Sequence, residues 1–283
     1  MVVNLLSHVH ETQSFAAMVF SQHHRSGSRH AGRSVDAVAL PPADVLRDEL
    51  GASAALWADA HHQVEADRWV ATSTAPAVDY NLIVCHGPHE SGVVAKSVEE
   101  IGAGKVPTLL ALAGEALGSA QLVVDAGWVC VGDRAFMARP GLPPTSDPAA
   151  RLATPDELPA VRAVLAETFE TTPELAVTAI PEPGNWPPGT EVWLLEENGD
   201  IRAVTAAVRV GSALGIWSTA TLPGHQGHGF GRRLLETVLD ATTADHSVLQ
   251  SSVVGEPFYR SLGYQVVERW QQWSRPRWVL GRT

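Results

Sequence analysis

Two segments of the chain recur at nearly the same distance along it, and this constrains the fold more than any single motif does. Residues 127–140 and 263–276 align at an offset of 136, and both end in Arg-Pro. Residues 80–88 and 215–223 align at an offset of 135, and a helical pattern follows each of them. A repeat of this length has the size of a small domain. We therefore expect the 283 residues to contain two copies of one unit.

A proline-rich stretch lies between the two copies. Residues 140–150 contain four prolines and show neither helical nor alternating periodicity, which is typical of a linker. We expect one domain over residues 1–139, a linker over 140–150 and a second domain over 151–283.

Charge and cysteine content exclude several classes of protein. The formal charge of −11 disfavours a nucleic-acid partner, because such proteins need clustered Lys and Arg. The first residues lack the cationic start of a signal peptide, and no apolar run approaches the roughly 20 residues of a membrane span. Cys85 and Cys130 do not fit a metal-binding spacing and are expected to be free, buried thiols. We expect a cytoplasmic protein with no metal and no membrane partner.

The second half shows a clear order of elements. Thr154 and Glu157 form a capping box ahead of a helix over 155–169. Asn198-Gly199 is a tight-turn signal between two alternating strands. The expected strands are 191–195, 204–210, 213–222, 247–253 and one that begins at Tyr264; further helices follow residue 230 and cover 256–262. This order predicts an α/β fold of the α+β type: a mostly antiparallel mixed sheet flanked by helices, rather than a doubly wound sheet.

A glycine-rich loop joins the strand at 213–222 to the helix that follows. In Gln226-Gly-His-Gly-Phe-Gly231 the glycines let the backbone approach a ligand closely, and the start of a helix offers unpaired N–H groups. Arg232 and Arg233 add positive charge, so a diphosphate would fit. A dinucleotide-binding motif does not fit, because no acidic residue ends a second parallel strand about 20 residues later.

A second motif, Pro257-Phe-Tyr-Arg-Ser-Leu-Gly-Tyr264, follows 26 residues after the loop. It predicts a short helix that carries Tyr259 and ends at Gly263 in a left-handed cap. Together, the loop and this motif resemble the GNAT superfamily of acyl-CoA-dependent N-acyltransferases. The family's loop is Gln/Arg-x-x-Gly-x-Gly/Ala, and its late motif is aromatic-Tyr-x-x-Leu-Gly-aromatic. The resemblance covers about residues 151–275.

The resemblance implies an opening between the strands at 213–222 and 247–253 that holds the pantetheine arm of acetyl-CoA or another acyl-CoA, the acyl donor. The main chain of Thr219 and Thr221 would bind the arm, and Tyr259 would protonate the leaving thiolate. The acceptor would be the amine of a small molecule. The residues implied to hold the pyrophosphate and its surroundings are Gln226, Gly227, His228, Gly229, Phe230, Gly231 and Arg232.

Some positions depart from the family pattern. The strand at 213–222 has no carboxylate, so Glu170 is a candidate general base by position, with Glu167 and Glu191 as alternatives and a water molecule as another. In the first half, Val123 stands where the second half has Tyr259, and Glu90 lies near the position of Gln226. We therefore expect tandem GNAT-like domains, of which residues 1–139 form a degenerate, non-catalytic copy that helps to shape the acceptor cleft. An unrelated helper domain is the alternative.

Two other functions fit the same residues. One is a GNAT-fold acyltransferase whose donor is a carrier-protein thioester or an aminoacyl-tRNA, although the negative charge counts against tRNA. The other is a non-catalytic module that senses acyl-CoA. The chain is expected to be a monomer or a homodimer.

Overall fold

The computed structural model of the chain describes residues 39–141 and 149–279. In these residues every strand belongs to one eleven-stranded sheet. Its strands are β1 (His61–Val64), β2 (Arg68–Thr72), β3 (Asn81–Cys85), β4 (Leu109–Leu112), β5 (Val129–Pro140), β6 (Arg151–Leu152), β7 (Thr190–Glu197), β8 (Asp200–Val210), β9 (Ala213–Thr221), β10 (His246–Ser251) and β11 (Gln265–Ser274). The α-helices are α1 (Ala43–Ser53), α2 (Val93–Ala103), α3 (Ala120–Asp125), α4 (Leu158–Thr168), α5 (Pro173–Ala179), α6 (Phe230–Ala241), α7 (Glu256–Ser261) and α8 (Pro276–Val279).

The sheet is mixed and mostly antiparallel, as the sequence predicts. Its order is β1-β2-β3-β4-β11-β5-β10-β9-β8-β7-β6, and only the β3–β4 and β9–β10 pairs are parallel within the described part of the chain. The hairpin between β7 and β8 turns at Asn198 and Gly199, both with positive φ, which is the conformation that a two-residue turn of this kind requires. The capping box of Thr154 and Glu157 is present as well.

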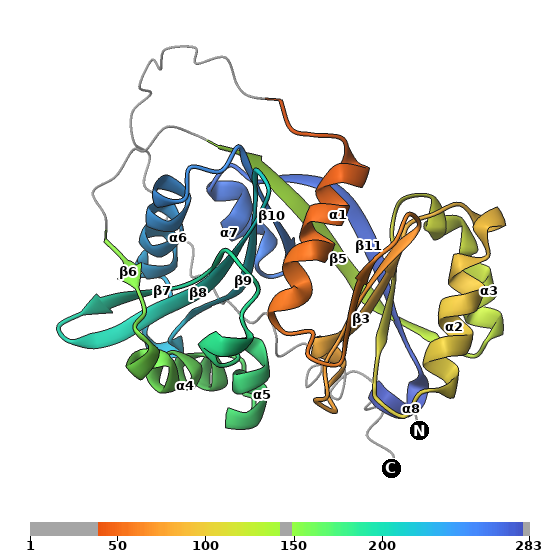
Figure 1. The fold of residues 1–283 in the computed structure, drawn as a ribbon, viewed down its shortest axis with the longest axis horizontal. Coiled ribbons are helices and arrows are strands. Elements are labelled where there is room, and N and C mark those ends of the chain that lie inside the picture. Colours follow the sequence, from red (N-terminus) through yellow and green to blue (C-terminus); the bar gives the residue numbers. More distant parts are fainter. Residues whose placement is uncertain (1–38, 142–148, 280–283) are drawn as a thin grey trace, which may run out of the picture.

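The last strands of the two halves are exchanged. β11, from the second half, lies between β4 and β5 of the first half, while β5 lies between β11 and β10 of the second half. The two long strands run side by side through the centre of the molecule (Figure 1). The two sheets expected from the sequence are therefore joined into one. The boundaries 1–139, 140–150 and 151–283 stay a prediction, and most of the linker lies outside the described residues.

Helices cover both faces of this sheet. On one face α1, α4 and α5 pack in a single apolar cluster that spans both halves, from Leu46 and Trp69 to Leu165 and Val204. On the other face α2 and α3 cover the first half, and α6 and α7 cover the second. The apolar positions of β8 alternate between the two faces as expected: Val204, Ala206 and Val208 face the first cluster.

Helix α1 of the first half packs against β8, β9 and β10 of the second half (Figure 1). Arg47 is 2.6 Å from Glu268 of β11, and Glu49 is 2.6 Å from His246 of β10. Ser53 Oγ accepts a hydrogen bond of 2.9 Å from Trp217 Nε1 of β9. The contacts are short and partly buried, so the two halves share one interface along α1.

The cysteines differ from the expectation in one respect. Cys85 is buried, as expected, but Cys130 is exposed because it lies in the first part of β5, whose residues 129–133 are largely open to solvent. No helix in the described part of the chain is both long enough and apolar enough to cross a membrane.

Candidate active site

The site begins where β9 and β10 part. The two strands pair only from His246↔Ala213 to Val248↔Gly215, and beyond this point they diverge. The neighbour of β9 on its other side is β8, and the pairing of these two strands is interrupted at Ser218 and Thr219. Ser218 has a φ of 52°. A non-glycine residue with positive φ is uncommon and marks a local distortion. The backbone groups of Ser218 and Thr219 therefore lie outside the sheet pairing on both sides.

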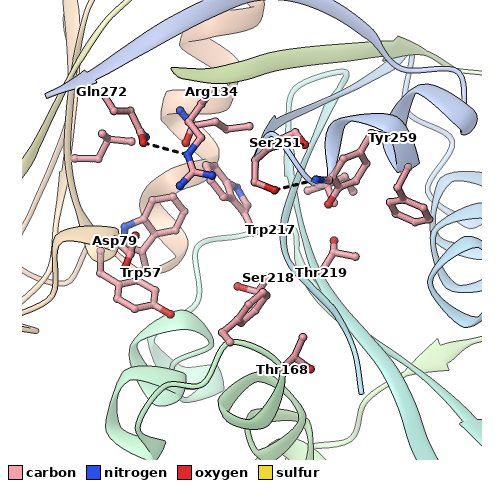
Figure 2. Close-up of a pocket in the computed structure, with 18 of the residues that line it drawn as sticks. Trp57, Asp79, Arg134, Thr168, Trp217, Ser218, Thr219, Ser251, Tyr259 and Gln272 are labelled. Atoms are coloured by element: carbon pink, nitrogen blue, oxygen red, sulfur yellow. Dashed lines mark hydrogen bonds between the residues drawn. The ribbon is translucent and has the colours of Figure 1, made fainter. Parts of the chain in front are cut away.

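A cavity opens at this distortion (Figure 2). Ile216, Trp217, Ser218 and Thr219 of β9 line it, and Gln250 and Ser251 of β10 lie opposite. From the first half, the cavity receives Trp57, Asp79, Tyr80, Leu82, Leu109 and Arg134; the remaining lining residues are Thr168, Phe169, Gln226, Ser252, Gly255, Phe258, Tyr259 and Gln272. The cavity thus lies between the two halves, and both contribute to its wall.

Tyr259 projects into the cavity from α7 (Figure 2). Its hydroxyl is influenced by the side chain of Thr219, whose Oγ1 lies 2.8 Å from Thr205 Oγ1. Thr205 in turn donates to the carbonyl of Trp217. Burial raises the pKa of Tyr259 above its ordinary value, and the nearby hydroxyl of Thr219 offsets only part of that increase. The hydroxyl therefore keeps its proton at neutral pH.

The glycine loop forms a second hollow beside the cavity, and Gln226 and Phe258 line both. The loop hollow is lined by Thr221, His225, Gly227, Gly229, Phe230, Gly231, Arg232, Pro257 and Ser261 together with these two residues. Gly227 and Gly229 have φ of 78° and 85°, and a Cβ on either would meet no atom within 4 Å. These glycines are therefore needed for their backbone conformation, not for lack of space.

The start of α6 presents donors to this hollow. The first backbone bond of the helix runs from Arg233 N to Gly229 O, so the amides of Phe230, Gly231 and Arg232 precede the helical pattern. The Oγ1 of Thr221 is buried there without a hydrogen-bond partner among the described residues. The residues that line the hollow include no carboxylate. This combination of free amides, an unpartnered hydroxyl and no opposing acid fits the pyrophosphate of a nucleotide.

The arginines and histidines of the loop are partly engaged already. Arg232 lies 3.3 Å from Glu236 and donates to Ser261 across the hollow, at 2.6 Å to its Oγ. Arg233 stacks over the ring of Phe230. His228 is exposed and makes a bond of 2.9 Å with the carbonyl of Gln226, and it does not line the hollow. Arg232 is therefore the charged side chain of the loop that lines the hollow, and the side chain of His228 does not line it.

The structure brings most of the sequence-predicted residues together; the exceptions are Glu170 and the exposed His228, which line neither hollow. Thr219 and Tyr259 line the cavity, Thr221, Gly227, Gly229, Phe230, Gly231 and Arg232 line the loop hollow, and Gln226 lines both. Glu170, named as a possible general base, is exposed, has a φ of 49° and does not line the cavity, although its neighbours Thr168 and Phe169 do. Glu191 is also directed elsewhere and accepts a bond from Trp193.

Sequence reasoning missed the residues from the first half. Asp79 lies on the short 3-10 turn Val78–Tyr80 directly before β3, and Arg134 lies on β5 opposite Trp270. Burial raises the pKa of Asp79 to about 6, although the nearby Arg134 acts to lower it. An acidic residue before a buried strand is only a weak sequence signal for a functional site. Arg134 lies beside the cavity only because the last strands of the two halves are exchanged.

Among the described residues, no group of three or more His, Cys, Asp or Glu side chains is placed to hold a metal ion.

Part of the second half matches a known family of domains. Residues 188–266 match the model of a family described as the acetyltransferase (GNAT) domain. A search of curated proteins found no match to the chain.

Solved structures show the same fold at low sequence identity. A GCN5-related N-acetyltransferase from Kribbella flavida is 18% identical, with a TM-score of 0.59, over 82% of this chain and 94% of its own. A GCN5-related N-acetyltransferase from Sphaerobacter thermophilus is also 18% identical, with a TM-score of 0.53, over 75% of this chain and 78% of its own. The similarity to the Kribbella flavida structure extends well beyond residues 188–266, so it includes parts of both halves.

Proposed function

From the GNAT acetyltransferase domain that residues 188–266 carry, we propose that the protein is an acyl-CoA-dependent N-acyltransferase with a small-molecule amine as its acceptor. The observation that carries the proposal is the continuity of the two hollows. The loop hollow at the start of α6 meets the cavity of Tyr259 through Gln226 and Phe258. A nucleotide held in the first can therefore present its far end in the second.

The donor would lie along β9. The amides from Gly227 to Arg232 would hold the pyrophosphate, and the unpaired backbone of Ser218 and Thr219 would bind the pantetheine arm. When bound, acyl-CoA supplies a thioester carbonyl that an amine can attack. The unpaired backbone N–H groups at the β9 distortion would stabilise the negative charge that develops on the carbonyl oxygen.

The transfer has a simple balance. A bond forms between the amine nitrogen and the acyl carbon, the carbon–sulfur bond breaks, and the nitrogen loses one proton while the sulfur gains one. Tyr259 holds a proton beside Thr219 and is the group placed to give it to sulfur. The proton from nitrogen leaves to water, and Tyr259 regains its own proton from water before the next turnover. Binding both reactants in one cavity supplies much of the rate enhancement.

The proposal is tested by thermal shift and by product analysis. Millimolar acetyl-CoA is expected to raise the melting temperature, because it binds the native state and not the unfolded chain. Incubation with a panel of amines is then expected to yield free coenzyme A and an N-acetyl product in equal amounts. The absence of any shift would contradict a free acyl-CoA donor and favour a carrier-bound one. A shift with no acylation of any amine would favour a sensor.

A further inference from the structure

The cavity of Tyr259 is polar at one end because of two charged side chains. Among the described residues that line it, Asp79 and Arg134 are the only ones with a formal charge, and both come from the first half. The rest of the wall is aromatic, apolar or neutral, including Trp57 and Trp217, whose ring centroids lie 4.3 Å apart. The first half therefore decides which charges a ligand meets there.

The two charges do not neutralise one another through contact. They attract each other, but among the ion pairs of the described residues none joins them, and the Nε of Arg134 instead donates to Gln272 at 3.1 Å. Burial disfavours the charged form of both groups, because it raises the pKa of Asp79 and lowers that of Arg134. A ligand with one positive and one negative group would compensate both.

The same cavity holds two buried donors without partners. Nε1 of Trp57 and Nε2 of Gln250 have no hydrogen-bond partner among the described residues. Buried polar groups are nearly always paired in proteins, so these two donors would gain partners if a ligand supplied acceptor atoms at this wall of the cavity. A carboxylate, which only accepts hydrogen bonds when ionised, fits such donors together with Arg134.

The charged end and the reacting end are separate. Figure 2 shows Asp79 and Trp57 on one side of the cavity and Tyr259 and Thr219 on the other, with Arg134 above. An acceptor whose amine reaches the thioester near Tyr259 can therefore place a different part of itself between Asp79 and Arg134.

We propose that the acceptor is an amino acid with a second amine on its side chain. The side-chain amine is acylated near Tyr259, the α-ammonium group binds Asp79, and the α-carboxylate binds Arg134. The inference rests on the proposed N-acyltransferase function. It assigns the first half the role of recognising the acceptor, with Asp79 and Arg134 as specificity-determining residues.

Three matched acceptors test it with the full-length protein and acetyl-CoA. Lysine carries both α-groups, 1,5-diaminopentane lacks the carboxylate, and 6-aminohexanoic acid lacks the α-ammonium. Ornithine and 2,4-diaminobutyric acid vary the chain length. For the best diamino acid, kcat/KM is expected to exceed that of its matched analogues by about ten- to a hundredfold, as expected for a lost charge-assisted hydrogen bond. Equal kcat/KM for an analogue, or no acylation of any of these diamino acids, overturns the inference.

Two variants assign the groups. Asp79→Asn is expected to lower kcat/KM for the diamino acid to near that of the analogue without the ammonium, and Arg134→Gln to near that of the analogue without the carboxylate. Asp133→Asn is the matched control, because Asp133 adjoins Arg134 but is exposed and lies outside the cavity lining. A uniform loss with every acceptor in both variants overturns the assignment.

A binding measurement separates this inference from the proposed function. An α-amino acid with an unreactive side chain, norleucine, is expected to raise the melting temperature of the wild-type protein and not that of Asp79→Asn. Acetyl-CoA is expected to shift both proteins equally. If acetyl-CoA binds and simple amines are acylated without preference for the α-groups, only the present inference fails. If acetyl-CoA neither binds nor reacts, the proposed function fails.

Discussion

At the scale of single residues, Tyr259 lies beside a row of hydroxyl groups. Beside its own hydroxyl, Thr219 Oγ1 is hydrogen-bonded to Thr205 Oγ1, which donates to the carbonyl of Trp217. The tyrosine hydroxyl lies beside this row, at the point where the pairing of β9 with β8 is interrupted. Position therefore distinguishes Tyr259 from an ordinary buried aromatic residue.

Replacement of Tyr259 by Phe removes the proton donor while preserving the ring. We expect kcat to fall by about 10²- to 10⁴-fold, the range typical of general acid–base catalysis, with acetyl-CoA binding unchanged. Steady-state kinetics and acetyl-CoA titration check this. Tyr264→Phe is the control, since Tyr264 is buried in the same half, accepts from Ser247 and does not line the cavity. Full turnover in the Tyr259 variant would exclude it as the acid.

Asp79 makes the stability of the protein depend on pH. Its pKa is about 6 in the folded protein against an ordinary value of 3.8, so between these values the native state binds more protons than the unfolded chain. Stability contributed by this group is therefore lost as pH rises through about 6. Asp79→Asn is expected to melt at a higher temperature than wild type at pH 8, with the difference shrinking toward pH 4. Thermal denaturation at both pH values checks this, and a lower melting temperature at pH 8 would contradict it.

At the scale of secondary-structure elements, the connection from β9 to α6 depends on backbone conformation. Gly227→Ala and Gly229→Ala add no clash, because nothing lies within 4 Å of either Cβ. They do force an L-residue into the left-handed region, at about 1–2 kcal/mol each. We expect weaker acetyl-CoA binding, because the loop would relax away from the conformation that presents its amides.

Gly224→Ala provides a matched control for this loop. Gly224 also has open space around its Cβ position, but its φ is not in the left-handed region. Titration of the three variants with acetyl-CoA is expected to separate it from the other two. Equal affinity in all three would mean that the loop tolerates another conformation.

Most of these elements were predictable because their signals are local. The capping box at Thr154, the turn at Asn198-Gly199 and the left-handed cap at Gly263 each depend on a few adjacent residues, and all three are present. The loop and the short helix of Tyr259 were found in the same way. The cavity was only partly predictable. Asp79 and Trp57 belong to segments without a functional pattern. Both meet the other site residues only through contacts between segments that are far apart in the sequence.

At the scale of the whole molecule, the neighbours of β5 and β11 could not be read from the sequence. Each strand alternates or contains aromatic residues in a way that indicates a strand, but pairing between residues that lie 127 to 145 positions apart leaves no local trace. The repeat predicted two similar units and left open how they associate. The structure shows that each half contributes its last strand to the centre of a common sheet.

The exchange predicts how the chain behaves when it is divided. Residues 151–283 expressed alone would leave β10 without β5, and β11 without both β4 and β5. Unpaired central strands promote aggregation, so we expect this fragment to be insoluble or to self-associate. Coexpression with residues 1–141 is expected to restore a soluble complex, measurable by copurification and size-exclusion chromatography. A soluble monomeric fragment with the melting temperature of the full chain would contradict this.

The exchange also determines where substitutions can accumulate. Glu90 lies on an exposed turn of the first half, and its replacement alters no strand pairing. Ala135, Phe136 and Ala138 of β5 are buried and each pairs with both β10 and β11, so a change there alters the neighbours of two strands of the second half. Over many generations, exposed turns of the first half such as that of Glu90 are therefore expected to vary, while its final strand and the residues that line the shared cavity are expected to stay constant.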